Sequence, residues 1–474
     1  MDPSSVALVL GVRQKLFLTS IYSPGSPIFL PRGTRIFNRL VGFLRDKYQC
    51  YGFDEVVTPN IYKKGLWRKS GHLDNYADDM FSVTSPSSST RAAAAAAAGS
   101  AAPDGPHASV HDDHDNAYRL KPMNCPGHCL IFAAEKRSYR DLPIRYADFS
   151  ALHRDEISGA LSGLTRVRRF HQDDGHIFCR PSQVEAEIAS TLDFVRDAYA
   201  DLGLGPYRLA LSTRPADHYI GAPEDWDRAE AALKRALHRT GLEWTINEGD
   251  GAFYGPKIDV ILKDSDGKEH QTATVQLDFQ LPKRFALEYQ APAPELEQKG
   301  ESTTDPALLE VSGAVTPVLI HRAVLGSLER LMALLIERYQ GKWPFWLNPR
   351  QCVIITVNDT EPVLKWARRT QSLLLGLLDR TDASASSASA GAVRRPTHLA
   401  VDIDESPRSV SLKVREAKQN GYGLIAVIGP KNVAAGTVTV DLPRKEGGDK
   451  HGQGTEPTPE KLLEFMLNEV DMYR

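Results

Sequence analysis

Cysteine is scarce in this sequence, with only five residues among 474, an odd number at irregular spacings. Such a set does not fit the paired framework of a small disulfide-stabilised secreted domain, so we expect a reducing compartment. No apolar run reaches the roughly 20 residues that a membrane-spanning helix needs, and we expect no membrane partner. The net charge of −3 gives no general excess of cations, so any nucleic acid would have to be bound by local basic patches.

Large apolar side chains are almost missing from two segments, residues 84–114 and residues 382–392, which are rich in alanine and serine. Neither segment can bury enough apolar surface to offset the entropy cost of ordering it, so both are expected to be flexible surface insertions. A glycine-rich patch at 447–456 is expected to be a third, smaller loop. Residues 1–17 are low in acid but too short for a transit peptide, which favours an ordinary or trimmed N-terminus.

The rest of the chain shows two different patterns of expected strands and helices, which indicates at least two domains. Residues 350–474 alternate strand-like and helix-like stretches, as in a small α/β domain with a mainly parallel or mixed sheet. Residues 20–340 contain clustered strands, two of them on either side of Asp266-Gly267, a strong hairpin signal. We therefore expect an α+β domain there, with an antiparallel sheet flanked by helices. The expected domain ranges are 1–345 and 346–474.

Polar side chains are concentrated in HRDEISGALSGLTRVRRFHQDDGHIF, residues 153–178. If residues 166–177 form a strand, alternate side chains share a face that mixes cations, an aromatic ring, an amide, a carboxylate and an imidazole. Arginine suits phosphate groups, and Arg154 and Glu156, of the same parity, add a phosphate donor and a base acceptor. A solvated charged strand is the alternative. The face in question comprises Arg166, Arg168, Phe170, Gln172, Asp174 and His176.

Two further stretches contain side chains that can bind a phosphate or a metal ion. A helix is predicted over residues 321–339, in which Arg330 has small neighbours at helical spacing and can extend toward a phosphate. An exposed Glu–Arg pair is the alternative there. The stretch KPMNCPGHCL, residues 121–130, places Cys125 and His128 at a spacing that suits a metal. No second Cys/His pair of zinc-finger spacing is present, so the residues alone leave open a metal site, a nucleophile or a turn.

Together, these motifs resemble those of class II aminoacyl-tRNA synthetases. Arg154-Asp155-Glu156 followed by a loop, an arginine and Phe170 resembles motif 2, residues 326–330 (GSLER) resemble motif 3, and GFDEVVTPN is similar to motif 1. Longer strings are similar to threonyl-tRNA synthetase in particular, in the same order along the chain. They are WRKSGHLDNYADDMF, LKPMNCPGHCLIF, SGALSGLTRVRRFHQDDGHIFC, STRP, GAFYGPKIDV, TVQLDFQLP and HRAVLGSLERL.

The resemblance implies one active-site zinc ion, bound by Cys125, His176 and His321, with His128 structural and Cys129 a small core residue. Three protein ligands leave one zinc coordination position open, as in reactive rather than structural sites. In the family, the amino and hydroxyl groups of threonine both bind the metal. Valine lacks the hydroxyl and is rejected, whereas serine differs from threonine by one methyl group and is expected to leak through.

The resemblance also implies the reaction. Threonine and ATP form threonyl-adenylate and pyrophosphate, and the threonyl group then passes to the 3′ end of tRNA(Thr). The implied catalytic residues are Arg154 at the α-phosphate, Arg330 at the β- and γ-phosphates with Mg²⁺, His72 in the transfer step and Lys257 in the pocket. The implied ATP-binding residues include Glu156 and Phe170 at the adenine and Arg166 at the phosphates, and Asp174 accepts from the threonine hydroxyl. The other implied ATP- or threonine-binding residues are Met123, Gln172, Tyr254, Gln271, Thr274, Gln276 and Ser327.

The chain departs from most family members in its short N-terminal part. The pattern begins near Ser23, so no domain that hydrolyses seryl-tRNA is expected, as in the short fungal mitochondrial enzymes. We therefore expect the mitochondrial matrix, with the cytoplasm as the alternative, and a homodimer through motif 1. The C-terminal domain resembles an anticodon-binding domain, where Lys413, Arg415 and Lys418 are tRNA contacts or simply solvated charges. The rival hypotheses are a related serine or proline ligase and a catalytically silent, synthetase-like tRNA-binding protein.

Overall fold

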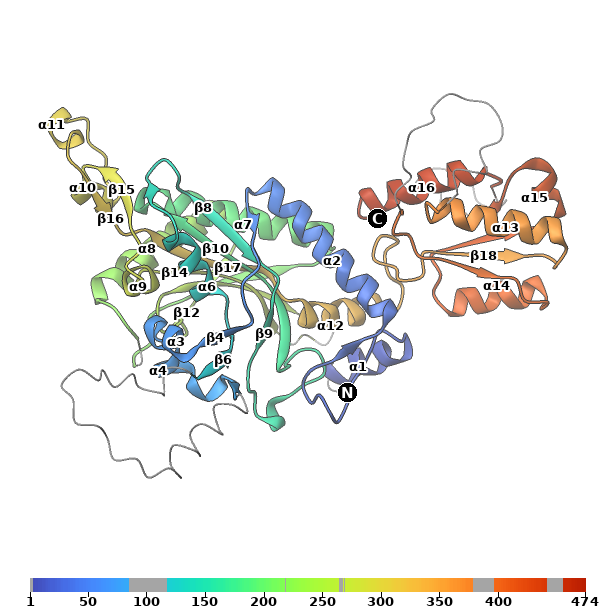
Figure 1. Cartoon of the computed structure of the whole chain (residues 1–474), viewed down its shortest axis with the longest axis horizontal. Coiled ribbons are helices and arrows are strands. Elements are labelled where there is room, and N and C mark those ends of the chain that lie inside the picture. Colours follow the sequence, from blue (N-terminus) through green and yellow to red (C-terminus); the bar gives the residue numbers. More distant parts are fainter. Residues whose placement is uncertain are drawn as a thin grey trace, which may run out of the picture. The chain divides into compact units, whose positions relative to one another are not determined.

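The computed structural model describes residues 3–84, 117–217, 219–263, 267, 269–377, 396–440 and 455–474. The two predicted insertions, apart from Thr84, lie outside these residues. The described chain forms two compact units (Figure 1). The first takes in residues up to Val9, Leu18–Ile28 and Val41–Arg338, and the second takes in Leu10–Phe17, Phe29–Leu40 and Tyr339–Arg474. The predicted domain boundary after residue 345 stays a prediction.

A nine-stranded sheet forms the centre of the first unit. Its strand order is β12-β11-β13-β14-β17-β10-β8-β3, with β9 paired to β10 beside this path. All pairs are antiparallel except β11 with β12 and β8 with β3. The strands are β3 Asp54–Glu55, β8 Ile144–Asp148, β9 Ala151–His153, β10 Arg169–Cys179, β11 Tyr207–Ser212, β12 Trp244–Asn247, β13 Lys257–Lys263, β14 Glu269–Asp278 and β17 Val318–Ser327. The predicted α+β class is confirmed, and so is the hairpin, formed by β13 and β14.

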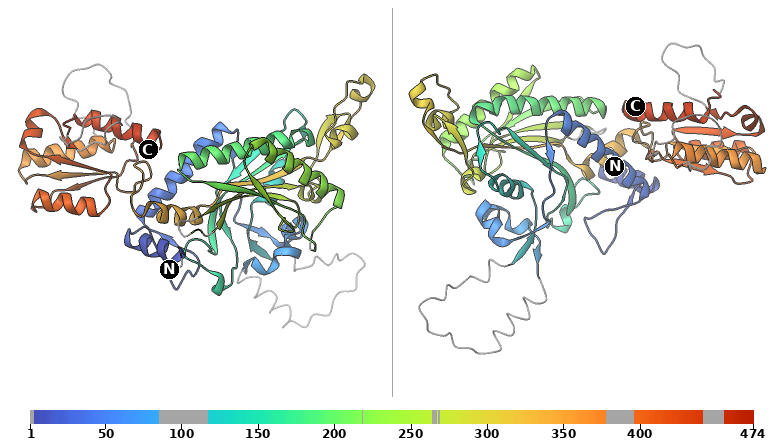
Figure 2. Two further views of the ribbon diagram at one scale, coloured as in Figure 1. Left: turned by 180° about the vertical axis from the view of Figure 1, so that it is seen from behind. Right: turned by 45° about the horizontal axis from the view of Figure 1, so that its top comes forward.

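Helices cover both faces of this sheet (Figure 2). Neighbouring residues of a strand point to opposite faces. In β17, His321 approaches Cys125 of α6 (Cys125–Ala133), whereas Arg322 lies over the ring of Phe194 in α7 (Val184–Asp201). Helix α7 packs beside α8 (Pro223–Thr240) and contacts β10, β14 and β17. The face that carries α6 is therefore separated by the sheet from the α7 face.

The remaining elements of the described chain lie outside the central sheets. Two three-stranded sheets, β4-β6-β5 and β16-β15-β7, belong to the first unit. These and the other elements outside the central sheets are β1 Phe17–Leu18, β2 Ile28–Phe29, β4 Ile61–Lys63, β5 Ser82–Val83, β6 Tyr118–Leu120, β7 Arg137–Ser138, β15 Tyr289–Pro292, β16 Ser312–Val315, α1 Pro3–Arg13, α2 Pro31–Cys50, α3 Lys64–Ser70, α4 His72–Tyr76, α9 Gln280–Arg284, α10 Pro294–Lys299, α11 Pro306–Leu309 and α12 Leu328–Tyr339.

Two element predictions were wrong in their bounds. The predicted helix over 321–339 is a strand as far as Ser327 and a helix only from Leu328. This strand is central and buried on both faces, so its sequence does not alternate between apolar and polar residues. Gly326, with φ of +64°, lies at the end of the strand. The strand predicted over 166–177 runs instead over Arg169–Cys179, because the preceding chain turns, with the Arg166 amide donating to the Ser162 carbonyl at 3.1 Å.

The second unit is the predicted mixed α/β fold. Its sheet has the order β19-β18-β20-β21, with β18 parallel to both neighbours and β21 antiparallel to β20. Both faces of β18 are buried, with Ile354 packed in one apolar cluster and Ile355 in another with Ala417 of α14. The elements are β18 Cys352–Thr356, α13 Glu361–Leu374, β19 Val401–Asp404, α14 Val410–Gln419, β20 Leu424–Ile428, α15 Pro430–Ala435, β21 Thr439–Val440 and α16 Pro459–Asp471.

Helix α14 corrects one functional expectation. Lys413 is buried and its ammonium group donates to the Thr356 carbonyl at 2.9 Å and to the Asp404 carbonyl at 3.3 Å. It therefore joins the ends of β18 and β19 and is not available to a tRNA. Arg415 and Lys418 on the same helix are exposed.

Candidate active site

The register of the central sheet brings four distant residues into one row. Gln276 of β14 lies opposite His321 of β17, and His321 lies opposite His176 of β10. Lys257 of β13 pairs with Gln276 and extends the row. Residues directly opposite each other in a sheet point to the same face. Four predicted site residues, spread over more than a quarter of the chain, therefore meet on the face that carries α6.

A second row lies two residues further along the same strands. It consists of Asp259 of β13, Thr274 of β14, Ala323 of β17 and Asp174 of β10. Asp259 is buried and binds several neighbours: it accepts from Ser212 Oγ at 2.8 Å and Thr274 Oγ1 at 3.3 Å. Its carboxylate also lies 3.1 Å from Lys257 Nζ. Asp259 was not predicted as a site residue, although its alternation with Lys257 in KIDV places both on one face.

Asp173, whose side chain points to the opposite face of β10, fixes the register of β10 against β17. Between Gln172 and Asp174, the pairing with β17 shifts register, and the buried Asp173 fills the irregularity. Its carboxylate accepts from the amides of Val324 at 2.8 Å and Leu325 at 3.1 Å and lies 3.4 Å from Arg322 Nη1. Burial raises the pKa of Asp173 to about 7, against the opposing effect of Arg322.

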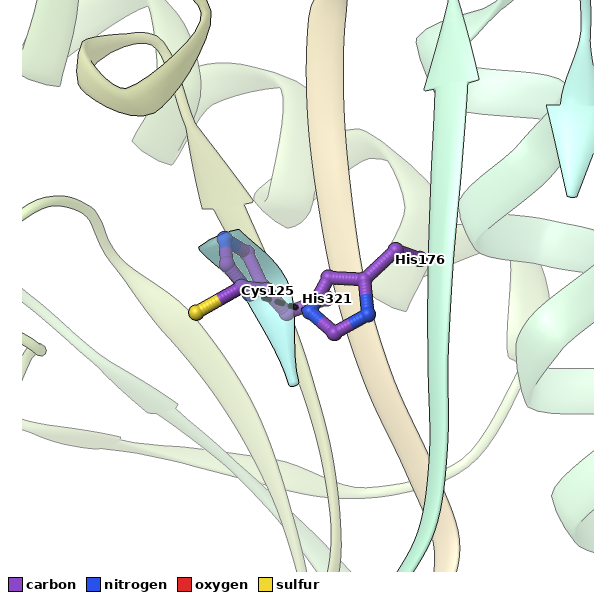
Figure 3. A group of neighbouring side chains, drawn as sticks. All are labelled: Cys125, His176 and His321. Atoms are coloured by element: carbon purple, nitrogen blue, oxygen red, sulfur yellow. Dashed lines mark hydrogen bonds between the residues drawn. The ribbon is translucent and has the colours of Figure 1, made fainter. Parts of the chain in front are cut away.

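Cys125, at the start of α6, joins the two histidines of the first row (Figure 3). One ligand atom from each of Cys125, His176 and His321 lies within 4.8 Å of the other two, and all three side chains are buried. The Nε2 atom of His176 is 2.9 Å from Nδ1 of His321. A thiol and two imidazoles at this separation form a donor set that suits Zn²⁺. The structure thus brings together the three residues predicted as zinc ligands.

The outer nitrogens of both imidazoles have partners. Asp278 Oδ2 lies 2.9 Å from His321 Nε2, and Asp278 Oδ1 accepts from the amides of Gln280 at 2.7 Å and Leu281 at 3.0 Å. His128 Nδ1 lies 2.8 Å from His176 Nδ1. Such partners fix the tautomer and orientation of a metal-binding histidine. Asp278 was not predicted, and nothing in the string TVQLDFQLP distinguishes it from a helix cap.

Burial favours the uncharged forms of the side chains in this cluster. Burial lowers the pKa of His176 well below its usual value, and His128 and His321 lower it further. Burial also raises the pKa of the Cys125 thiol well above its usual value, with the negative charge of Asp174 adding to the effect. The protein alone therefore favours neutral imidazole and thiol groups. A bound divalent cation favours the thiolate and neutral imidazole that act as ligands, so the residues fit a metal ion.

A cavity of about 410 Å³ adjoins this cluster. Its walls are mostly polar, and Tyr254 donates a hydrogen bond to Gln276, while Asn124 Nδ2 donates to Asp174 Oδ2 at 3.1 Å. Burial raises the pKa of Asp174. The predicted residues that line this metal-side cavity are Met123, Cys125, Arg154, Gln172, Asp174, His176, Tyr254, Lys257, Gln271, Thr274, Gln276 and His321.

A second cavity, of about 310 Å³, shares lining residues with the first and carries three arginines. The guanidinium group of Arg154 lies 5.0 Å from the ring centre of Phe170, and within the described residues its buried Nε has no hydrogen-bond partner. The predicted residues that line this arginine-side cavity are Arg154, Glu156, Arg166, Phe170, Gln172, Gln271, Thr274, Gln276, Ser327 and Arg330.

The arginines of this cavity differ in their surroundings. Arg166 is largely exposed and pairs with Glu156 at 2.8 Å. Arg330 is held by two carbonyls, those of Thr165 at 3.2 Å and Gln271 at 3.1 Å. Burial lowers the pKa of Arg330, and the charges of Arg154 and Arg166 lower it further. Three guanidinium groups with a single carboxylate among them suit a polyanionic ligand.

His72 is the one predicted site residue that lines neither cavity. It is fully buried, with Nδ1 2.8 Å from Ser70 Oγ and Nε2 3.6 Å from Cys125 Sγ. Burial lowers its pKa to about 4, so its ring is neutral at physiological pH. The structure thus places His72 behind a predicted metal ligand, and its role in transfer stays a prediction.

Comparison with known proteins identifies the family. The tRNA synthetase class II core domain (G, H, P, S and T) matches residues 109–300, and the anticodon binding domain matches residues 351–447. The "Probable threonine--tRNA ligase, mitochondrial" of Schizosaccharomyces pombe is 48% identical over 425 residues, which are 90% of this chain and 81% of that protein. The chain belongs to the threonyl-tRNA synthetase family. The predicted family and enzyme class, a class II aminoacyl-tRNA synthetase, are confirmed.

Other family members agree. The "Threonine--tRNA ligase, mitochondrial" of Saccharomyces cerevisiae is 43% identical over 91% of this chain and 85% of its own length. Several longer relatives are matched over about half of their length. The crystal structure of the RNA binding domain of threonyl-tRNA synthetase from Cryptosporidium parvum Iowa II has a TM-score of 0.78 at 37% identity, over 98% of both chains.

The two yeast relatives bear on location as well as on family. Both are named as mitochondrial, and both are matched over more than four fifths of their length. The predicted mitochondrial location is thereby confirmed. Among the described residues, no helix combines the length and apolar character needed to cross a bilayer.

Proposed function

We propose that this chain is a threonine–tRNA ligase that activates threonine with ATP and transfers the threonyl group to tRNA(Thr). One observation carries the proposal: the arginine-side cavity and the metal-side cavity share Arg154, Gln172, Gln271, Thr274 and Gln276 in their walls. A ligand that fills both would place a polyphosphate among cations and a small amino acid beside the Cys125–His176–His321 cluster. The substrate pair of this family has these two chemical ends.

ATP binds in the arginine-side cavity in this proposal, with Phe170 against the adenine ring and Glu156 toward its amino group. Arg166 and Arg330 hold the β- and γ-phosphates with Mg²⁺. Arg154 lies in the wall common to both cavities, and it binds the α-phosphate and the threonine carboxylate together. A carboxylate oxygen attacks the α-phosphorus, pyrophosphate leaves, and fixed cations stabilise the charge that develops on the phosphoryl oxygens.

Threonine binds in the metal-side cavity, and Cys125, His176 and His321 hold a zinc ion there. When bound, the ion supplies a Lewis acid for the amino and hydroxyl groups of the substrate. Asp174 accepts a hydrogen bond from the hydroxyl. Tyr254 and Gln172 orient the amino acid, with Lys257 and Gln276 in the wall. Valine lacks the hydroxyl and would leave the buried Asp174 without that partner.

The rest of the enzyme follows from the second unit and from the family. We propose that the anticodon-binding unit contacts tRNA(Thr), that two chains associate as a homodimer, and that the enzyme works in the mitochondrial matrix. The two family models that match, a class II core domain over residues 109–300 and an anticodon binding domain over residues 351–447, name no hydrolytic domain. We therefore propose that these residues hold no hydrolytic site for seryl-tRNA, and that serine misacylated by this chain persists in its presence.

Amino-acid-dependent ATP–pyrophosphate exchange tests the proposal. The assay compares threonine, serine and valine on zinc-loaded and chelated enzyme, with zinc content measured in each sample. We expect exchange with threonine, weaker exchange with serine, none above background with valine, and loss of exchange when zinc is removed. Exchange that survives full zinc removal would disprove the metal mechanism. If none of the three amino acids supports exchange, the result would favour the catalytically silent tRNA-binding protein.

A further inference from the structure

The second unit contains a pocket of about 180 Å³ that neither the sequence motifs nor the proposed reaction uses. All of its lining residues belong to this unit. The walls come from the end of α1, the first turn of α2, the segment that leads into β18 and the turn after α14. The lining residues are Arg13, Gln14, Lys15, Arg32, Gly341, Trp343, Asn348, Pro349, Arg350, Asn420 and Gly421.

The charge of this pocket is of one sign. Four of its lining residues are cationic, namely Arg13, Lys15, Arg32 and Arg350, and none is acidic. Among the described residues, none of the four forms an ion pair. Like charges gathered around one hollow repel each other, by an amount that grows as water is removed. This repulsion among the four cations lowers the stability of the folded protein, and an anion bound in the pocket would offset it.

Arg350 is the most constrained of these cations. Its Nη1 donates to the Asn420 carbonyl at 2.6 Å and its guanidinium group lies 5.3 Å from the ring centre of Tyr422, which fixes its orientation. The buried Nε has no hydrogen-bond partner within the described residues. Burial lowers the pKa of Arg350, and the charge of Arg32 lowers it further. A buried donor of this kind is rarely left unsatisfied in a folded protein.

Arg32 adds a second positive charge to the wall of the pocket. It lies in the first turn of α2, a helix of 20 residues, where the helix dipole has its positive end. Its side chain is half-buried, whereas Arg13 and Lys15 are exposed. The pocket therefore has two partly buried cations, Arg32 and Arg350, and two exposed ones, Arg13 and Lys15. This combination suits a phosphate group that belongs to a longer molecule and needs an open side.

We propose that this pocket binds a backbone phosphate of tRNA. The inference rests on the proposed function, because it takes the anion to be a phosphodiester of the substrate RNA. Guanidinium groups bind phosphate oxygens in a bidentate manner, and phosphate contacts supply affinity and position without base specificity. The pocket thus anchors the tRNA through its backbone, in the same unit that matches the anticodon binding domain.

The test compares tRNA binding and exchange in the same variants. Arg32→Ala and Arg350→Ala, singly and together, are expected to raise the Kd for tRNA, and the KM in aminoacylation, by roughly tenfold per residue, with kcat little changed. Each lost phosphate contact reduces the slope of log K against log salt by about 1. ATP–pyrophosphate exchange needs no tRNA, so it reports separately on the proposed catalytic site.

Controls separate binding from folding and RNA from free phosphate. Arg13→Ala and Lys15→Ala change exposed side chains, so their effects on tRNA affinity cannot come from core disruption; Lys461→Ala removes an exposed charge elsewhere in the unit. We expect the first two to weaken tRNA binding and the third to leave it unchanged. Equal tRNA affinity and salt slope in all pocket variants would overturn the proposal. Tight binding of inorganic phosphate that Arg32→Ala abolishes, with tRNA affinity intact, would assign the pocket to a free anion and refute it too.

Discussion

Replacing Asp278 by asparagine tests how the fold prepares a histidine to bind a metal. Asp278 Oδ1 accepts from two backbone amides at the start of α9, and Oδ2 lies 2.9 Å from His321 Nε2. Asparagine keeps one acceptor oxygen, and the two amides require that oxygen in the same place. The amide nitrogen then faces His321 Nε2 as a donor. His321 must accept there and carry its proton on Nδ1, the nitrogen 2.9 Å from His176.

A protonated nitrogen cannot bind a metal, so the variant stabilises the wrong tautomer of His321. Loss of such a partner typically lowers metal affinity by about 10–100-fold, or about 1.4–2.7 kcal/mol. We expect Asp278→Asn to show this loss in competition with a chromophoric zinc chelator, together with a raised KM for threonine in ATP–pyrophosphate exchange. The KM for ATP should change little, because none of the three predicted metal ligands lines the arginine-side cavity.

Asp141→Asn is the matched control for this change. Asp141 also accepts from a backbone amide, that of Ser138 at 2.7 Å, but on the surface and with no histidine partner. Its zinc affinity and kinetics should match those of the unchanged enzyme. If Asp278→Asn binds zinc as tightly as the unchanged enzyme while remaining folded by circular dichroism, Asp278 does not control the tautomer of His321. The role given to it here would then be wrong.

Three other changes should give distinct results. Lys413→Ala removes a buried cation with carbonyl partners and should lower the free energy of unfolding by about 3 kcal/mol, whereas Arg415→Ala should leave it within about 0.5 kcal/mol. Arg330→Ala should slow exchange by about 100–1,000-fold, and Arg330→Lys should restore it only in part, since lysine lacks the planar fork. Because burial lowers the pKa of His72 to about 4, the unfolded chain binds a proton there first as pH falls. Between roughly pH 6.5 and 4 this makes unfolding easier, and His72→Gln should remove that part of the slope.

Each of these has a matched control and a contradicting outcome. Arg338→Ala, at the exposed end of α12, should exchange normally; a comparable loss there would mean that Arg330→Ala acts through general damage to the helix. The pH dependence of unfolding is compared between His72→Gln and the unchanged protein, both depleted of metal; the same slope in the two would contradict the role given to His72. Full stability of Lys413→Ala in urea denaturation would show that its buried hydrogen bonds contribute nothing to the second unit.

The chemistry of the site was accessible from the sequence, whereas its assembly was not. The types of residue in the motifs indicated a phosphate end, whereas the metal end followed only from the resemblance to a known family. His176 and His321, however, are 145 residues apart, and only the pairing of β10 with β17 places them side by side. Strand register depends on which faces are buried in the whole sheet, and that information is spread over many strands.

Residues 321–327 show why the element type also failed. A short apolar run bounded by a glycine is compatible with a buried strand or with a buried helix, and periodicity alone does not decide between them. The structure decides through neighbours on both sides, Gln276 and His176, with which His321 pairs. Asp278 was missed for a related reason: its contact with His321 exists only after β14 and β17 pair.

Under the proposed function, the lining of the metal-side cavity also determines how selective the enzyme is for its amino acid. Its apolar lining is limited to a few groups, among them Met123 and Phe253, and the rest is largely polar. The methyl group of threonine therefore gains little there, about 1–3 kcal/mol at most, so serine should be activated within roughly 10–200-fold of threonine. Valine instead leaves Asp174 buried without a hydroxyl donor, a loss that polar sites turn into discrimination of about 10,000-fold or more. Equal exchange with valine and serine would show that the hydroxyl is not what this cavity recognises.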